Sequence, residues 1–89
     1  MREATLHIVN RLGLHARASA RFVQEASRFK SQVFLKKGDI EINAKSILGV
    51  MMLAAGPGSE LTLRVEGEDE EQTVEALAAL VANRFGEEQ

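Results

Sequence analysis

The hydrophobic residues of this 89-residue chain repeat at two different spacings, and the spacing changes several times along the chain. A period of two, typical of strands that pack one face on a core, covers residues 2–9, 33–36, 40–43 and 61–66. A period of three to four, typical of helices, covers residues 16–29, a short stretch at 47–53 and the region after 69. The sequence therefore predicts the element order β-α-β-β-α-β-α.

This order restricts the architecture, because only one face of the predicted sheet is apolar enough to be covered by helices. The predicted fold is an α/β (α+β) open-faced two-layer sandwich, with a four-stranded, mostly antiparallel sheet and three helices on one face. A chain of this length has room for one modest core, so we expect a single domain over residues 1–89.

Turn and capping residues mark the ends of the predicted elements. Lys37-Gly38-Asp39 predicts a hairpin turn, and Ser46 predicts the N-cap of the short helix, which must end before Pro57. Asp69 followed by Gln72 resembles a capping box at the start of the last helix. The apolar stripe predicted for that helix consists of Val74, Leu77, Ala78, Val81 and Phe85, and a polar tail is expected from Gly86.

The composition argues against several classes of protein. The net charge is −2, and there is no Trp or Tyr, whereas a nucleic-acid-binding domain usually needs a basic face and stacking aromatics. There is no Cys, and the two His lack a nearby carboxylate cluster, so we expect no metal site and no cofactor. No apolar run approaches the roughly 20 residues that span a bilayer, so we expect a cytoplasmic protein without membrane insertion.

The segment Asn10-Arg11-Leu12-Gly13-Leu14-His15-Ala16-Arg17-Ala18 contains the strongest candidate site. Its histidine lies between a glycine-containing loop and the predicted helix start, where backbone amides without intrahelical partners favour an anion. An imidazole titrates near neutrality and can act as a nucleophile, so His15 is predicted to handle a phosphoryl group. The alternative is a histidine that only caps the helix or faces solvent. His7 alternates with core residues and is expected to face solvent.

Two motifs, Gly13-Leu14-His15-Ala16-Arg17 and Lys45-Ser46-Ile47-Leu48-Gly49-Val50-Met51, together resemble HPr, the histidine-containing phosphocarrier of the bacterial phosphoenolpyruvate-dependent phosphotransferase system. The resemblance extends over essentially the whole chain. It implies a phosphoryl carrier, not an enzyme, that accepts the group on Nδ1 of His15 from Enzyme I and passes it to IIA components of sugar permeases. Arg17 matches the arginine of the family motif.

The chemistry of the residues agrees with these implied roles. In-line phosphoryl transfer needs positioning and charge neutralisation, which the amides of Ala16, Arg17 and Ala18 and the Arg17 guanidinium can provide. One residue departs from the family pattern, because most members have proline where this chain has Ala18. Alanine is expected to leave the helix start looser and to add one N–H donor.

The second motif predicts a regulatory position and a docking surface. In part of the family, a serine in this motif is phosphorylated by HPr kinase/phosphorylase, and Ser46 matches that serine, although it also serves as an ordinary N-cap. A domain this small cannot bury every apolar residue of the short helix. By resemblance to the family, the expected docking residues are Arg21, Ile47, Leu48 and Met51, with plain core packing as the alternative.

Two further functions remain open at this level. A nitrogen-branch or regulatory HPr paralogue would use the same phosphohistidine chemistry without sugar transport. A non-catalytic interaction module would use the fold alone.

Overall fold

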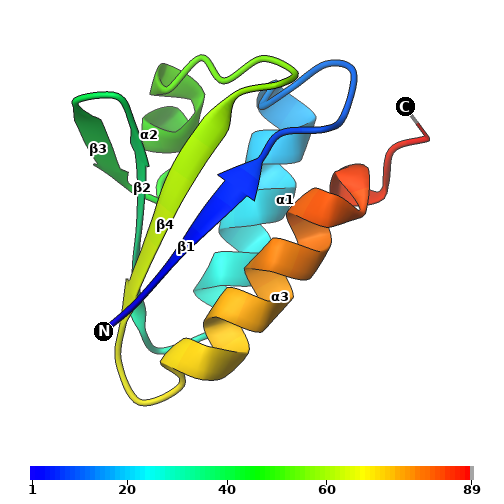
Figure 1. Cartoon of the computed structure of the whole chain (residues 1–89). Helices are drawn as coiled ribbons and strands as arrows, with labels where there is room; N and C mark the ends of the chain where they lie inside the picture. The colour runs from blue at the N-terminus through cyan, green and yellow to red at the C-terminus, as the bar shows by residue number, and fades with distance from the viewer. Residues whose placement is uncertain (89) are drawn as a thin grey trace.

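A computed structural model describes residues 1–88 and contains one four-stranded sheet and three α-helices. The strands are β1 (Arg2–His7), β2 (Gln32–Lys37), β3 (Ile40–Asn43) and β4 (Glu60–Glu66), in the spatial order β1-β4-β2-β3. The helices are α1 (Ala16–Ser27), α2 (Ile47–Met52) and α3 (Glu70–Ala82). All three strand pairings are antiparallel, and the helices lie on one face of the sheet (Figure 1), which confirms the predicted open-faced sandwich.

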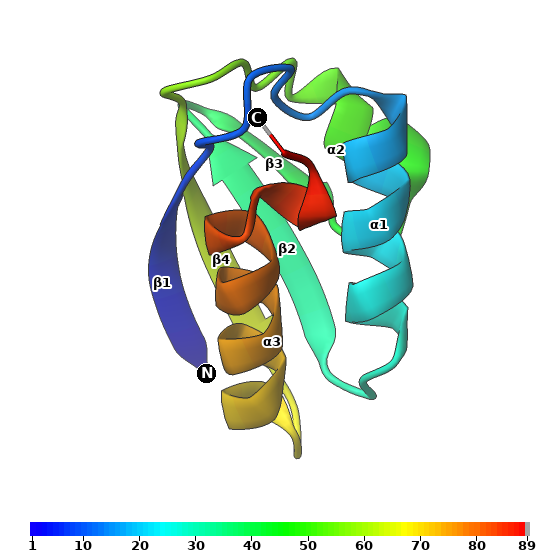
Figure 2. The same ribbon diagram turned by 90° about the vertical axis from the view of Figure 1, so that its right-hand side faces the viewer.

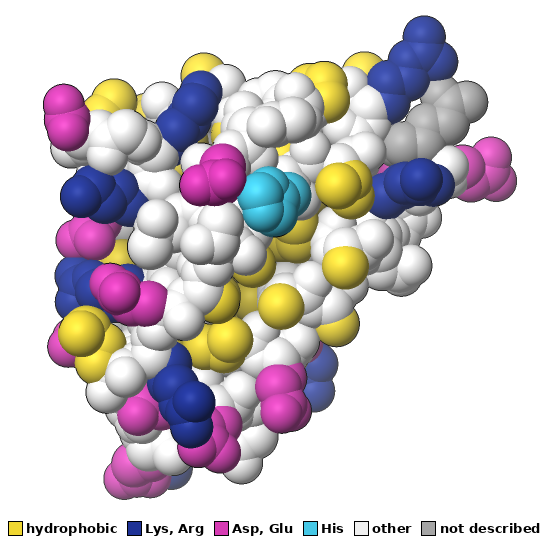
Figure 3. All heavy atoms as spheres, viewed as in Figure 1, with side chains coloured by type: hydrophobic (Ala, Val, Ile, Leu, Met, Phe, Trp, Pro, Cys, Tyr) yellow, Lys and Arg dark blue, Asp and Glu magenta, His cyan; other side chains and the backbone are white. Residues whose placement is uncertain are grey.

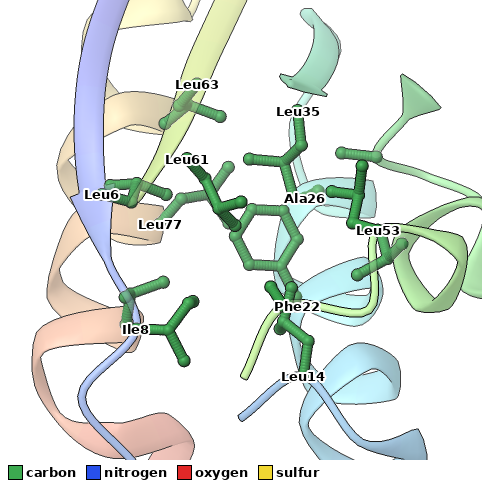
Figure 4. Packing of buried hydrophobic residues seen from close by; sticks show 14 of the residues in the cluster. Leu6, Ile8, Leu14, Phe22, Ala26, Leu35, Leu53, Leu61, Leu63 and Leu77 are labelled. Carbon is green, nitrogen blue, oxygen red and sulfur yellow. The ribbon is translucent and has the colours of Figure 1, made fainter. Parts of the chain in front are cut away.

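The sheet register brings the apolar face of each strand into one layer. Leu6 of β1 lies opposite Leu61 of β4, and Leu63 of β4 lies opposite Leu35 of β2. The view in Figure 2 shows α1 and α3 side by side across this layer. Phe22 of α1 is almost completely buried among the leucines (Figure 4), as the helical stripe predicts. The alternating pattern of the strands therefore sets which face receives the helices.

The opposite face of the sheet is open and polar. Arg64 lies over the ring of Phe34, with its Cζ atom 4.3 Å from the ring centroid, and donates to Glu41 at 2.9 Å. This hydrogen bond with Arg64 lowers the pKa of Glu41 from its ordinary value. Charge pairing and stacking cover this face without a second layer of helices.

Figure 3 shows the side of the molecule on which β1 and α3 lie next to each other. Apolar side chains gather between the two elements, and charged groups of both signs surround them. The lining of this shallow groove includes Val9, which is half exposed, and Ala78 and Ala82 of α3. Within residues 1–88, no helix has both the length and the apolar character required to cross a membrane.

The ends of several elements differ from the sequence prediction. β1 ends at His7 rather than residue 9, because its partner strand begins at Glu60 opposite His7. α3 ends at Ala82, and Phe85 lies in a separate 3₁₀ turn, Arg84–Gly86, with a φ of 55°. The prediction that Phe85 is buried is confirmed, whereas its assignment to the last helix is wrong, because left-handed backbone cannot continue an α-helix.

The predicted capping box at Asp69 is also wrong. The Asp69 side chain forms no capping hydrogen bond with α3. Its carboxylate instead accepts the backbone N–H groups of Lys30 at 2.9 Å and Ser31 at 3.0 Å, together with the Ser31 hydroxyl. Asp69 therefore joins the start of α3 to the loop between α1 and β2, and these hydrogen bonds lower its pKa from 3.8 to about 2.

We expect Asp69 to give the folding stability a specific acid dependence. Because its pKa is lower in the folded state, the stabilisation is fully present above about pH 4 and is lost as the pH falls toward 2. Asp69→Asn should reduce the loss of stability in this window and should be less stable than the parent at pH 7. Urea unfolding at pH 2–7 measures both effects. Asp39→Asn, at an exposed hairpin position, is the control; equal pH profiles for Asp69→Asn and the parent would contradict the assignment.

Candidate functional site

The loop between β1 and α1 is held against the segment that follows α2. Gly13 N–H donates to Asn10 O at 3.2 Å, and Leu14 N–H donates to Ala55 O at 2.8 Å. Gly13 has a φ of +64°, and a Cβ atom at this position would lie 2.4 Å from Ala55 O. Only glycine fits this conformation and this close approach, and the loop consequently brings the next residue but one, His15, to the start of α1.

His15 is the N-cap of α1. Its Nδ1 accepts the N–H of Arg17 at 3.3 Å, and its carbonyl accepts the N–H of Ser19 at 2.8 Å. The side chain is 29% exposed, so the ring is accessible. Since Nδ1 acts as an acceptor, the neutral ring that fits this geometry has its proton on Nε2. The helix-capping role, which the sequence offers as an alternative to chemistry, is therefore present together with a partly exposed imidazole.

Glu87 is the functional neighbour that the sequence analysis missed. The turn at residues 84–86 leads the chain back to the site, where Glu87 Oε2 lies 2.5 Å from His15 Nε2 and Glu87 Oε1 accepts from Asn10 Nδ2 at 2.9 Å. The hydrogen bond from Asn10 is the main cause of a lowered Glu87 pKa, with His15 contributing after the opposing effect of desolvation. The carboxylate is therefore ionised at neutral pH and can accept a hydrogen bond from Nε2–H of His15.

The site opens into a hollow of about 750 Å³. Its lining residues are Arg11, Leu12, His15, Ala16, Arg17, Glu87 and Glu88. The Arg17 guanidinium is exposed and forms no hydrogen bond or ion pair with residues 1–88 in the structure, so it can meet an anion in the hollow. Ala16 and Arg17 both line the hollow, whereas Ala18 is completely buried in the core beneath it.

α2 packs beside α1, with Ser46 at its N-cap. Ser46 is exposed, and its Oγ accepts the N–H of Gly49 at 3.1 Å, which confirms the predicted cap. Leu48 is 76% exposed, and the other exposed apolar side chains of α2 are Ile47, Met51 and Met52. Val50 faces the core, so the helix has one buried and one accessible apolar side.

Two other residues from the sequence analysis lie apart from these surfaces. Arg21 is exposed on α1, but the hollow that it lines faces α3 rather than α2. His7 is exposed on β1, as predicted, and its Nδ1 is 3.9 Å from a carboxylate oxygen of Glu60.

Fold and site together define a class of small α/β domains that present one accessible histidine at a helix N-terminus. A family model described as the PTS HPr component phosphorylation site matches residues 2–83. The chain therefore belongs to the HPr family, whose members are phosphocarriers of the phosphotransferase system rather than catalysts.

Individual relatives agree with this assignment. Phosphocarrier protein HPr of Cupriavidus necator is 58% identical over 80 residues, which are 90% of either chain. A crystal structure of HPr from Thermoanaerobacter tengcongensis has a TM-score of 0.96 and 47% identity, with 100% of both chains covered. The HPr-like protein Crh of Bacillus subtilis is 56% identical over 69 residues, which are 78% of this chain and 81% of Crh.

Proposed function

We propose that this protein carries a phosphoryl group on Nδ1 of His15, which it accepts from Enzyme I and donates to IIA components of sugar permeases. One observation carries the proposal: an accessible imidazole has Nδ1 at the N-terminus of α1 and Nε2 against the Glu87 carboxylate. Single-domain organisation over residues 1–89, which the length of the chain favours, and a cytoplasmic location belong to the same proposal.

The transfer step follows from the positions of the two ring nitrogens. The Nδ1 lone pair attacks the donor's phosphorus, the N–P bond forms, and the bond from phosphorus to the donor breaks with its electron pair. The Nε2 proton stays in place, so the phosphorylated ring is cationic and lies beside the Glu87 carboxylate. The Arg17 N–H, which Nδ1 accepts before transfer, is then available to a phosphoryl oxygen.

The direct test combines the protein with Enzyme I and labelled phosphoenolpyruvate. We expect one equivalent of acid-labile phosphate, with ¹⁵N NMR placing it on Nδ1 of His15. Absence of label, or acid-stable label on a hydroxyl group, would count against the proposal. Addition of a IIA domain should then remove the label from the carrier.

Arg17 is proposed to stabilise the transferring group. Arg17→Ala should slow phosphoryl acceptance by about tenfold or more, because a charge-assisted hydrogen bond that forms with the transferring group is lost. The side chain is exposed, so the free energy of unfolding should change little. Rapid-quench labelling measures the rate. Arg28→Ala, at the other end of the same helix, is the control, and equal rates for both variants would remove Arg17 from the site.

Ser46 and the exposed side of α2 are proposed as a regulatory site and a docking surface. Phosphorylation by an HPr kinase/phosphorylase would add about two negative charges at an N-cap, where the helix tolerates an anion but a partner contact would change. Docking is proposed at Leu48, Met51 and Ile47; Arg21, which the sequence places in the same role, faces α3 and would contact a partner outside this apolar surface. ATP labelling in cell extract tests the regulatory role, and it should disappear in Ser46→Ala.

A regulatory or nitrogen-branch paralogue is the second candidate function. The similarity to the HPr-like protein Crh of Bacillus subtilis, whose solution structure is described as that of a catabolite repression HPr, favours the regulatory alternative. Transfer of label to a panel of IIA domains separates the candidates, because a sugar-branch carrier should donate to IIA domains of sugar permeases.

A further inference from the structure

Asn10 is a fully buried polar residue whose amide joins two parts of the site. Its Nδ2 donates to Gly13 O at 2.8 Å and to Glu87 Oε1 at 2.9 Å. Both partners are acceptors, so the amide nitrogen and not the oxygen must face them. The amide oxygen, Oδ1, is buried and has no hydrogen-bond partner among residues 1–88. Both N–H donors of the Asn10 side-chain amide therefore form hydrogen bonds, whereas its oxygen has no partner among the described residues.

One of the two hydrogen bonds is local, and the other connects residues that lie 77 positions apart in the sequence. One bond fixes the turn that leads to His15, and the other fixes one oxygen of the Glu87 carboxylate. Because a carboxylate is planar and rigid, holding Oε1 also determines the direction of Oε2, which meets His15 Nε2 at 2.5 Å. Asn10 thus acts on the orientation of the imidazole without contacting it.

We propose that Asn10 is a positioning residue that holds Glu87 against His15, so that the ring keeps its proton on Nε2 and leaves Nδ1 free to accept a phosphoryl group. This inference rests on the proposed function of His15. Two contacts set the protonation of the ring. The Glu87 carboxylate at Nε2 favours a proton on that nitrogen, and the Arg17 N–H at Nδ1 favours a lone pair there. The contacts at Nε2 and Nδ1 therefore favour the same tautomer, in which the proton is on Nε2.

The hydrogen bond from Asn10 is also the largest cause of the lowered Glu87 pKa. An ionised aspartate at position 10 would supply no donor and would repel the Glu87 carboxylate, and a protonated one would supply a single O–H donor for two acceptors. A serine would supply a single O–H donor for the two acceptors. Among the small polar side chains, the amide of asparagine meets these requirements.

The test reads the tautomer directly in the unphosphorylated protein. The ¹⁵N shifts of Nδ1 and Nε2 of His15 should show the Nε2–H form in the parent and a mixture of tautomers in Asn10→Ala. Glu87→Ala should give the same mixture, and the double variant Asn10→Ala/Glu87→Ala should change no further, because Asn10 acts through Glu87. Glu75→Ala, at an exposed position of α3 outside the hollow, should leave the parent spectrum unchanged.

Phosphoryl acceptance from Enzyme I is the second measurement. Each single variant should lose about tenfold in rate, as expected when one charge-assisted contact at the reacting ring is lost, and the double variant should lose no more. An unchanged tautomer in Asn10→Ala would overturn the proposal. A further change of the tautomer ratio when Asn10→Ala is added to Glu87→Ala would also overturn the proposal. Asn10 would then act through the Gly13 turn and not through Glu87.

Two features keep the test decisive. If Asn10→Ala fails to fold, Asn10→Leu, which has a similar shape and no donor, should release Glu87 and give the Glu87→Ala spectrum; the parent spectrum in Asn10→Leu would overturn the proposal. Failure of the proposed function is recognised separately, because a parent protein that takes no phosphate from Enzyme I still reports its tautomer by NMR.

Discussion

Replacement of His15 by alanine should abolish acid-labile phosphorylation by Enzyme I and phosphoenolpyruvate. The variant lacks the atom that forms the N–P bond, and neither the Arg17 guanidinium nor the backbone amides of the hollow can replace it as a nucleophile. The protein should remain folded, because the side chain is partly exposed and its loss removes one N-cap contact, with a cost of about 1 kcal/mol. Labelling after gel separation measures the phosphate, and urea unfolding measures the stability.

His7→Ala is the matched control for this prediction. His7 is the other histidine of the chain, and it lies exposed on β1 with a Glu60 carboxylate oxygen 3.9 Å from its Nδ1. The His7→Ala variant should take up the same amount of acid-labile phosphate as the parent protein. Acid-labile phosphate that remains on His15→Ala would show that the carrier site lies elsewhere, and a loss in both variants would indicate an indirect effect on the fold.

The fold was predictable because its main determinants are periodic. Leu61, Leu63 and Val65 alternate along β4 and all face the helices, and Phe22 and Ala26 lie one turn apart on the buried side of α1. Such patterns depend only on the geometry of one element and on burial. The order of the strands in the sheet could not be predicted in this way, because it depends on which elements pack together and not on the periodicity of any one of them.

The site was predictable only in part. His15 and Arg17 belong to a local motif at a helix start, so their proximity follows from their spacing. Glu87 lies 72 residues from His15, and the chain returns to the site only because Arg84 and Phe85 adopt left-handed conformations. Neither residue is of a type that usually signals positive φ, and Gly86, which is of such a type and has a φ of 80°, marks only the end of the turn.

Asp69 shows the same limitation. Its position before a helix fits a capping box, but the backbone amides of Lys30 and Ser31 bind its carboxylate more closely than α3 does. A capping motif describes what one helix can accept from its own sequence. It contains no information about a loop from elsewhere in the chain that presents unpaired N–H groups to the same oxygens.

Gly13 joins a local backbone requirement to a long-range contact, and together they position the loop that carries His15. Gly13→Ala should therefore lower both the stability and the rate of phosphoryl acceptance. A Cβ atom would meet Ala55 O at 2.4 Å and the Cα atom of Gly56 at 2.8 Å, in addition to the strain of a φ of +64°. We expect a loss of about 3 kcal/mol, which lowers the melting temperature of a domain of this size by on the order of 15 °C. Phosphoryl acceptance should fall as well, because relief of the clash moves the loop that carries His15.

Gly38→Ala separates the two causes, because Gly38 has a similar φ of +60° and no neighbouring atom within 4 Å of the point that a Cβ atom would occupy. It should lose only about 1 kcal/mol, the ordinary cost of a left-handed alanine, and should accept phosphate as the parent does. Thermal unfolding of the three proteins, followed by labelling below their transitions, gives both quantities. Equal losses of stability in the two variants would show that the contact with Ala55 is relieved without cost, and that the loop is not fixed by this close approach.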